Sequence, residues 1–273
     1  MQQEPLGNRP VDGKTSLAGV QDKIVLARGN GTWLRVFDGY PSTHILKPTQ
    51  ADRPTMIHDE EYGLRLARSA GVSTFASWVE EFDGVEALVI ERYDRRGCRR
   101  LHQEDLAQAL GIGGNEKYQR VGGRASFARI ASVLTEHADR DSLERLARMV
   151  TYAVAIGNLD LHAKNLSLLH AADGAITLAP GYDLVPMVHQ PEDGELALAV
   201  NGTYRHASIT RQDLVEEVRS WGVRSSSTLV DLTLQQVRVC VGSEVPPPRA
   251  HPGLASVIAR FVDNLLAGRA VGS

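Results

Sequence analysis

The order of segment types along the chain is the feature that most constrains its fold. Before residue 93, short strand-like runs are separated by Asn30-Gly31, Asp38-Gly39 and Asp83-Gly84, which are turn sequences that favour hairpins. After residue 93, apolar residues recur mostly at helical spacing. The sequence therefore predicts an α+β fold of two lobes, with a β-rich N-terminal lobe at residues 1–93 and a mostly helical C-terminal lobe at residues 94–273.

The predicted elements follow this order. Strands are expected at Ile24–Ala27, Thr32–Phe37, Thr43–Lys47, Ala76–Phe82 and Val85–Glu91, and a later hairpin at Leu166–His170 and Ala175–Ala179. Helices are expected at Thr55–Ser69, Gln103–Leu110, Gly123–His137, Ser142–Ile156, Thr210–Trp221, Ser227–Val241 and Gly253–Leu266. The helix ending at Ile156 would deliver Asn158 and the segment after it into the cleft between the lobes.

That segment is Asp160-Leu-His-Ala-Lys-Asn165, which has the D-x-x-x-x-N spacing of phosphotransferase catalytic loops. In such a loop the Asp accepts the proton of the attacking hydroxyl, and the Asn holds a metal on the phosphates. Further along, Asp183 follows the predicted hairpin, where kinases keep a second metal-binding Asp. Alone, each residue could be an ordinary turn or strand-edge residue. Together they predict Asp160 as the catalytic residue and Asn165 and Asp183 as magnesium ligands.

Two upstream signals appear in kinase order. Lys47 is the only charge in a strand-like run, and the helix after it carries Glu60 and Glu61. A strand lysine paired with a helix glutamate holds the α- and β-phosphates of ATP in kinases. Small residues between Thr15 and Lys23 would let backbone N–H groups approach phosphate oxygens.

At this point the chain resembles the HipA-like serine/threonine kinases of bacterial toxin–antitoxin systems. The resemblance rests on motifs spread over most of the chain: Ser16-x-Ala-Gly-x-Gln-x-Lys23, His44-Ile-Leu-Lys47, Asp59-Glu-Glu-Tyr62, Glu91-Arg-Tyr-Asp-Arg95, Gln103-Glu-Asp105, Lys117-Tyr118 with Gly122-Gly123, Asp160-x-His-Ala-Lys-Asn165 and Tyr182-Asp183.

The resemblance implies ATP and Mg²⁺ as cofactors, and it assigns roles to most of these residues. Asp160 would accept the proton, Glu60 would be the helix glutamate, and Ser16, or the neighbouring Thr15, would be autophosphorylated. The implied nucleotide-binding residues are Ala18, Gly19, Val20, Gln21, Asp22 and Lys23 in the phosphate loop, and Glu91, Arg92 and Tyr93 in the hinge. Outside these two segments they are Lys47, Gln103, His162, Ala163, Lys164, Asn165, Tyr182 and Asp183.

Two departures from the family pattern bear on function. Leu161 stands where larger members have a glycine, which affects the expected geometry of the loop. Only about fifteen residues precede Ser16, whereas larger toxins carry a further N-terminal subdomain of roughly domain size. We therefore expect the short, HipT-like form, in which a small separate protein replaces that subdomain. The implied partners are this protein, a helix-turn-helix antitoxin that supplies the DNA contact, and a substrate that is an aminoacyl-tRNA synthetase.

Composition is consistent with a cytoplasmic enzyme. No apolar run approaches the ~20 residues that span a bilayer, and the two cysteines, Cys98 and Cys240, are too few for a disulfide framework. A net charge of −3 argues against strong unaided DNA binding. None of the nine histidines suggests a structural metal site. The basic cluster of Arg92, Arg95, Arg96, Arg99 and Arg100 could meet an anion, but a solvated loop is expected for its members outside the family motif that contains Arg92 and Arg95.

Two other functions remain open. A small-molecule kinase of the aminoglycoside or choline phosphotransferase type also has a D-x-H-x-x-N loop, but it would need only Asp160, His162 and Asn165. A pseudokinase that acts as a binding module would not need the phosphate-binding and metal-binding residues at all.

Overall fold

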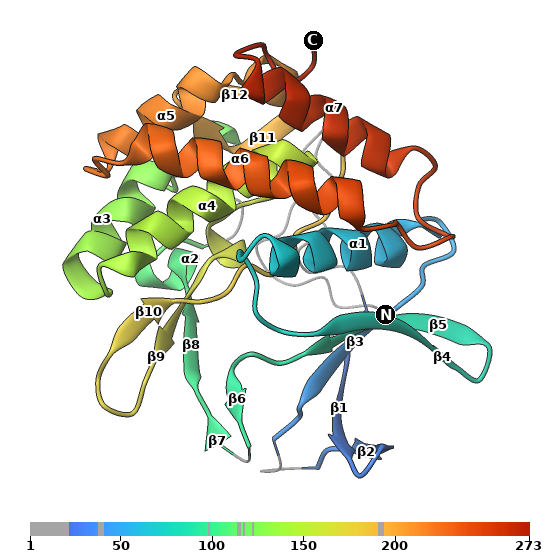
Figure 1. Cartoon of the computed structure of the whole chain (residues 1–273). Helices are drawn as coiled ribbons and strands as arrows, with labels where there is room; N and C mark the ends of the chain where they lie inside the picture. Colours follow the sequence, from blue (N-terminus) through green and yellow to red (C-terminus); the bar gives the residue numbers. More distant parts are fainter. Residues whose placement is uncertain are drawn as a thin grey trace.

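The computed structural model describes residues 22–37, 41–97, 99–113, 116, 118–121, 123–190 and 194–273. Figure 1 shows a β-sheet built from the first part of the chain, with a layer of helices from the second part packed on the side where the sheet meets α1 (Met56–Ser69). The α+β, two-lobed arrangement predicted from the order of segments is confirmed.

The N-terminal lobe is built on a five-stranded antiparallel sheet. Its strands are β1 (Ile24–Gly29), β2 (Thr32–Arg35), β3 (His44–Pro48), β4 (Ser77–Phe82) and β5 (Val85–Glu91), in the spatial order β2-β1-β3-β5-β4. Because side chains alternate along a strand, Ile45 and Lys47 face α1 and the cleft, whereas His44 and Leu46 face outward. The outer face carries a small apolar cluster around Leu46, Ala87 and Val89.

Three short elements follow the sheet. The strands β6 (Arg95–Arg96) and β7 (Arg99–Arg100) form a hairpin, and β8 (His102–Asp105) pairs with β9 (Ser167–His170), which also pairs with β10 (Ile176–Leu178). The predicted helix at Gln103–Leu110 is therefore wrong in its first half. Only α2 (Leu106–Ala109) is helical, because Asp105 caps it with a reciprocal hydrogen-bond pair to Gln108 and leaves the residues before it free to pair with β9.

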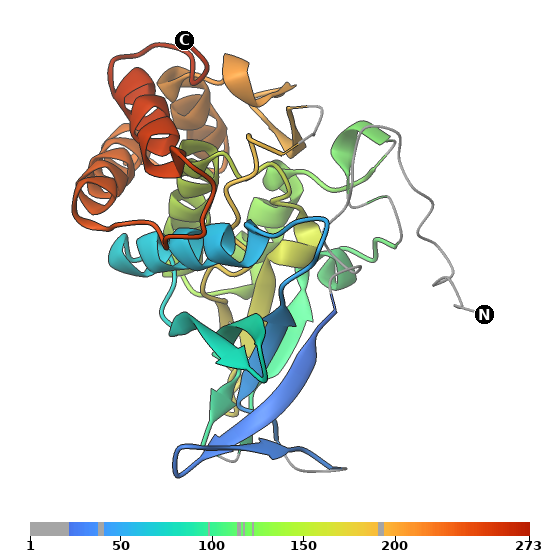
Figure 2. The ribbon, with the colours of Figure 1, turned by 90° about the vertical axis from the view of Figure 1, so that its right-hand side faces the viewer.

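The helical lobe surrounds α4 (Asp141–Ile156). The helices α3 (Phe127–His137), α5 (Arg211–Ser220), α6 (Ser226–Ser243) and α7 (Leu254–Leu266) pack around it (Figures 1 and 2). Residues Leu146, Ala155 and Ile156 are fully buried. The helix ends at Gly157, whose φ of 73° is a left-handed conformation that favours glycine. A Cβ there would lie 2.7 Å from the side chain of Val188, so this position also requires the absence of a side chain.

Neither the β6–β7 hairpin nor a later one was predicted from the sequence. The strands β11 (Glu195–Val200) and β12 (Thr203–Arg205) are joined by Asn201 and Gly202, both with positive φ. Asn-Gly is the strongest short-range hairpin signal, and β11 is nearly all apolar and buried, which resembles a buried helix segment as much as a strand. Single 3₁₀ turns occur at Gln119–Val121, Ala163–Asn165 and His206–Ser208. Within the described ranges, none of the helices has both the length and the apolar character needed to cross a membrane.

Candidate active site

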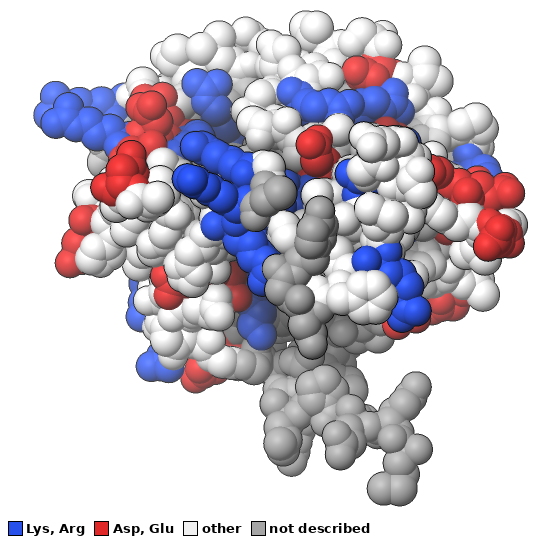
Figure 3. Space-filling model, turned by 90° about the horizontal axis from the view of Figure 1, so that it is seen from below, with Lys and Arg blue, Asp and Glu red and all other residues white. Residues whose placement is uncertain are grey.

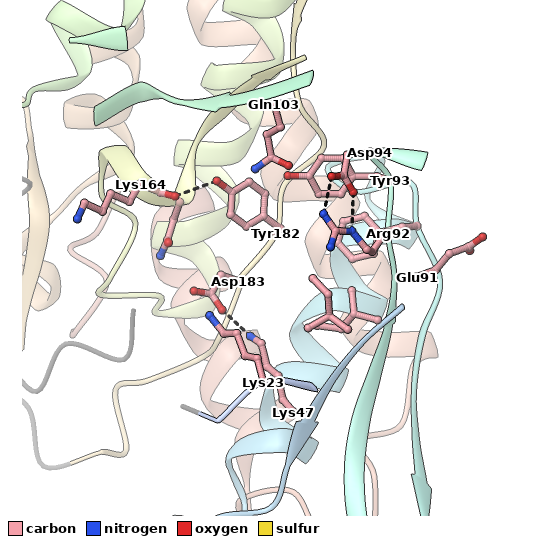
Figure 4. A pocket seen from close by; sticks show the side chains of 14 residues that line it. Lys23, Lys47, Glu91, Arg92, Tyr93, Asp94, Gln103, Lys164, Tyr182 and Asp183 are labelled. Carbon is pink, nitrogen blue, oxygen red and sulfur yellow. Dashed lines mark hydrogen bonds and ion pairs between the residues drawn. The ribbon is translucent and has the colours of Figure 1, made fainter. Parts of the chain in front are cut away.

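Lys47 is held between two carboxylates that come from different parts of the chain. Its Nζ lies 2.5 Å from Oε1 of Glu60 on α1. It also lies 2.7 Å from Oδ1 of Asp183, a contact that Figure 4 shows. The Lys47 and Glu60 side chains are 6% and 1% exposed. The neighbouring Glu61 is bound instead to Arg65, one turn along the helix, at 3.0 Å. The strand lysine, the helix glutamate and the distant Asp183 thus meet in one place.

The charges in this group stabilise one another. Burial alone would lower the pKa of Lys47, but Asp183 and Glu60 outweigh it and raise that pKa above its ordinary value. Burial would raise the pKa of Asp183, yet the ammonium group of Lys47 holds it below its usual range. Burial dominates at Glu60 and raises the pKa of its carboxyl, against the opposing effect of Lys47. Of these three groups, Lys47 and Asp183 line the cleft, whereas Glu60 lies behind them.

The catalytic-loop sequence forms a compact, hydrogen-bonded turn. Asn165 Nδ2 donates to the backbone oxygen of Asp160 at 2.9 Å, and the backbone N–H of Asp160 donates to Oδ1 of Asn158 at 3.0 Å. The Asp160 carboxylate, in a residue 9% exposed, accepts a 3.4 Å hydrogen bond from the hydroxyl of Tyr118. His162 is fully buried, with Nε2 3.7 Å from Oδ1 of Asp160. Asp160 is thus fixed in orientation next to Asn165, but it is not among the residues that line the cavity described below.

Asn158 joins this loop to the metal-binding candidate Asp183. Its Nδ2 donates to the backbone oxygen of Asp183 at 3.3 Å, while its Oδ1 accepts from Asp160. Asp183 has a φ of 56°, an uncommon conformation for a residue with a side chain. From the sequence, Asn158 is expected in the cleft without a role, and Tyr118 appears only within a family motif. No local pattern marks either residue as a partner of Asp160.

A cavity of about 350 Å³ adjoins these groups, within the size range of small-molecule sites. Its walls include the apolar side chains of Ile45, Phe75 and Ile90. Tyr93 and Tyr182 stack with ring centroids 5.8 Å apart, and both rings line the cavity. Burial raises the pKa of the hydroxyl of each tyrosine above its ordinary value. A flat aromatic group such as a purine suits a pocket with these walls.

Hydrogen bonds fix the tyrosine wall. The Tyr182 hydroxyl donates to the backbone oxygen of Lys164 at 2.9 Å and lies 2.6 Å from Oγ of Ser167. Gln103 Nε2 donates to the same Oγ at 3.0 Å. Gln103 therefore contacts the cavity and also holds Ser167, a residue that the sequence analysis did not assign to the site.

The predicted hinge, Glu91 to Tyr93, borders the cavity. Its two charged side chains, Glu91 and Arg92, have different surroundings. The Glu91 carboxylate points away from the other labelled side chains (Figure 4). The Arg92 guanidinium forms two bonds to Asp94, at 2.9 Å and 2.7 Å. Burial would raise the pKa of the Asp94 carboxyl, but Arg92 and Arg95 hold it below its usual range. Arg92 and Arg95 thus serve to fix the hinge.

The other arginines of this segment face solvent. Arg96, Arg99 and Arg100 are exposed on the β6–β7 hairpin. Figure 3 shows Lys and Arg side chains gathered on the face seen from below, where this hairpin lies.

The remaining expected residues either line the cavity, lie away from it, or fall outside the described part of the chain. Lys23 and Lys164 line the cavity, and Lys23 lies close to Lys47 and Asp183 in Figure 4. Asp22 is exposed, and Ala163 is buried behind the loop. Leu161, which replaces a glycine of larger members, packs into the apolar core with 5% exposure. The following residues lie outside the described part of the chain: Ser16, Ala18, Gly19, Val20, Gln21, Lys117 and Gly122.

A β-sheet lobe, a helical lobe, and a cleft that joins a Lys–Glu–Asp group to an Asp/Asn loop define a protein-kinase-like fold. Two solved structures share it. The Shewanella oneidensis HipA in a complex with HipB and operator DNA is 24% identical, with a TM-score of 0.78 over 97% of this chain and 66% of that chain. The Helicobacter pylori proinflammatory kinase CtkA is 9% identical, with a TM-score of 0.56 over 91% of each chain.

Sequence comparison gives the family. The model of the HipA-like C-terminal domain matches residues 15–243, and the chain belongs to this family. Y4mE of Sinorhizobium fredii is 34% identical over 186 residues, which cover 66% of this chain and 44% of that protein. The serine/threonine-protein kinase toxin HipA of Shewanella oneidensis is 28% identical over 282 residues, 94% of this chain and 64% of the toxin. The chain thus spans about half to two thirds of the length of these relatives.

Proposed function

We propose that the chain is a protein serine/threonine kinase that uses ATP and Mg²⁺. The observation that carries this proposal is Lys47, which bridges Glu60 and Asp183 at 2.5 Å and 2.7 Å beside the loop of Asp160 and Asn165. In kinases a lysine in this setting contacts the α- and β-phosphates, and the carboxylate partner keeps it extended. The lobes would meet at the hinge near Tyr93.

The residues of the site fit both ATP and Mg²⁺. Asp183 and Asn165 supply oxygen atoms, the ligands that Mg²⁺ prefers, and the bond that Asn165 makes to Asp160 uses its amide nitrogen. Among the described residues, no three His, Cys, Asp or Glu side chains could hold a metal together, and Mg²⁺ in kinases relies on one or two protein ligands together with water and phosphate oxygens. When bound, the metal would neutralise charge on the phosphates. Phe75, Tyr93 and Tyr182 would hold the adenine.

The protein's own part in the reaction is to position groups and move one proton. Asp160 would accept the proton of the attacking hydroxyl on its carboxylate, whose orientation is fixed by Tyr118 and by the backbone bond to Asn158. Lys47, Lys23 and Lys164 would surround the phosphates with positive charge. The barrier would fall through orientation and electrostatics and not through a covalent enzyme intermediate.

The biological role that we propose is that of a toxin in a toxin–antitoxin system. The support is membership of the HipA-like family and the similarity to a HipA toxin and to a HipA chain solved with HipB and operator DNA. An antitoxin of the helix-turn-helix type would supply the DNA contact. From the family resemblance, the substrate would be an aminoacyl-tRNA synthetase, and Ser16 would be autophosphorylated.

Labelled ATP tests the proposal directly. The purified protein is incubated with a cell extract and labelled ATP, the phosphorylated band is identified, and Asp160→Asn serves as the inactive control. A labelled synthetase that disappears with the control supports the proposal. Transfer of label only to small molecules would support an aminoglycoside-type kinase instead, and a lack of any ATP turnover would support a pseudokinase.

A further inference from the structure

The segment between α6 and α7 is bound to α1, the helix that carries Glu60. Glu244, directly after α6, accepts a 2.7 Å hydrogen bond from Arg65 and a 3.1 Å bond from Ser69, and its backbone oxygen accepts from the hydroxyl of Tyr62 at 3.3 Å. The next residue, Val245, accepts from Arg65 through its backbone oxygen at 2.8 Å. One short piece of chain thus holds the C-terminal half of α1.

The N-terminal half of α1 is held by the other end of the same segment. Asp59, fully buried and next to Glu60 in sequence, accepts a 2.7 Å bond from the backbone N–H of His251. Its second oxygen lies 3.1 Å from Nε2 of His189, which belongs to the chain that follows Asp183. The rings of His189 and His251 stack at 4.1 Å. Asp59 therefore joins α1 to two parts of the helical lobe at once.

Close backbone packing supports the same conclusion. A Cβ at Gly63 would lie 2.2 Å from the backbone oxygen of Leu184, so α1 rests directly on the residue after Asp183. The hydroxyl of Tyr152 on α4 also donates to the backbone oxygen of Gly63 at 2.5 Å. Figures 1 and 2 show α1 lying between the sheet on one side and α6 on the other.

The position of α1 matters to the site because Glu60 is one of the two carboxylates at Lys47. A cation bound by Asp183 would compete with Lys47 for the Asp183 carboxylate. Glu60 would then be the group that keeps the Lys47 ammonium extended. Movement of α1 away from the helical lobe would withdraw Glu60, but it would also break the bonds of Glu244 and Asp59.

From these contacts we infer that the α6–α7 segment positions the phosphate-binding lysine: Glu244 and Asp59 fix α1, α1 fixes Glu60, and Glu60 orients Lys47. Glu244 and Asp59 are positioning residues, since neither is among the residues that line the cavity. This inference rests on the proposed function. It adds that the lysine–glutamate pair is permanently assembled by the helical lobe and does not form through a swing of α1.

A double-mutant cycle on nucleotide affinity tests the inference, with a fluorescent ATP analogue and Mg²⁺ as the probe. Glu244→Ala should weaken binding about fivefold, the scale of one typical intramolecular hydrogen bond, and Glu244→Gln should restore much of it. In a Glu60→Gln background, Glu244→Ala should have almost no further effect, because the two residues act in series. A merely structural role would give equal losses in both backgrounds.

The matched control is Asp263→Ala. This change removes an exposed ion pair between Arg238 of α6 and Asp263 of α7 without touching α1, and it should leave nucleotide affinity unchanged. Wild-type affinity in Glu244→Ala, or additive effects of Glu244→Ala and Glu60→Gln, would overturn the inference. If Glu244→Ala does not fold, Ser69→Ala replaces it in the same cycle. A wild-type protein that binds no nucleotide would instead overturn the proposed function, and this inference with it.

Discussion

Lys47 is a buried cation that also lines the cavity of the candidate site. A lone ammonium group with 6% exposure would be costly to bury, but two carboxylates from residues 13 and 136 positions away compensate its charge. Removing one partner of such a group leaves an uncompensated charge behind. Substitutions here should therefore affect both nucleotide binding and stability, whereas substitution of Asp160, which does not line the cavity, should affect mainly the chemical step.

The first prediction separates the two catalytic carboxylates. Asp160→Asn should lower phosphoryl transfer by about 10²-fold or more, since it removes the proton acceptor, while ATP affinity changes little. Asp183→Asn should abolish transfer and also weaken Mg²⁺-dependent ATP binding. Both changes should relieve growth arrest. Transfer rates and nucleotide titrations with and without Mg²⁺ measure this, and near-normal transfer by Asp160→Asn would show that the proton acceptor is wrongly assigned.

The second prediction concerns the buried histidine His206. Its ring nitrogen Nε2 lies 2.8 Å from the backbone oxygen of Val154, and burial lowers the pKa of the ring below its ordinary value near 6.5. The unfolded chain therefore binds this proton at a higher pH than the folded protein. Stability is unaffected above about pH 6.5 and falls as the pH drops below it, by at most about 1.4 kcal/mol per pH unit until the folded-state pKa is reached.

His206→Gln should flatten this dependence, because glutamine can still donate to Val154 but does not take up the proton. Melting temperatures at pH 7.5 and pH 5.5 give the comparison. His137→Gln, at an exposed position on α3, serves as the control and should retain the wild-type slope. An equal slope in His206→Gln and wild type would show that other groups cause the acid sensitivity.

At the scale of elements, the sequence predicted most strands and helices within a few residues because their periodicity and turn signals agree. The errors occur where local signals conflict with tertiary pairing. Residues 102–105 carry no strand signal of their own and become β8 only through β9. The nearly all-apolar β11 has no alternation to mark it as a strand. The contacts of α1 with the α6–α7 segment join residues about 180 positions apart, and no local pattern encodes them.

The third prediction tests the packing of α1. Gly63→Ala should destabilise the protein by about 1–3 kcal/mol, the usual range for overpacking, because the new methyl group would overlap the backbone of Leu184. Gly242→Ala in α6 is the control, since its Cβ would meet only the end of the Arg238 side chain at 4.0 Å. Alanine in a helix is more stable than glycine by about 0.5–1 kcal/mol. Denaturant midpoints should therefore move in opposite directions, and a stabilising Gly63→Ala would mean that α1 packs less closely than described.

At the scale of the whole molecule, the two faces of the N-terminal sheet differ. The inner face packs against α1 and the cleft, whereas no helix in the described ranges lies over the outer face (Figures 1 and 2). On that outer face Trp33, Trp78 and Phe82 are only partly buried around the cluster of Leu46, Ala87 and Val89. Val85, which pairs with Phe82 at the turn between β4 and β5, is 52% exposed. Exposed apolar surface of this kind often marks a binding site.

The fourth prediction is that a small companion protein, encoded beside this one, binds the N-terminal lobe around Thr32 to Pro48 and Ala76 to Glu91 and restrains the toxin. Co-expression with the neighbouring reading frames should yield a complex on size-exclusion chromatography. Val85→Asp should weaken that complex about tenfold or more, because a charge would be buried at the interface. Val239→Asp, which places the same change at an exposed site on α6, should leave it intact. If the protein elutes alone and remains equally toxic with both neighbours present, the prediction of a companion protein is wrong and the kinase assignment is unaffected. If the complex forms but Val85→Asp does not weaken it, the companion exists and uses another surface.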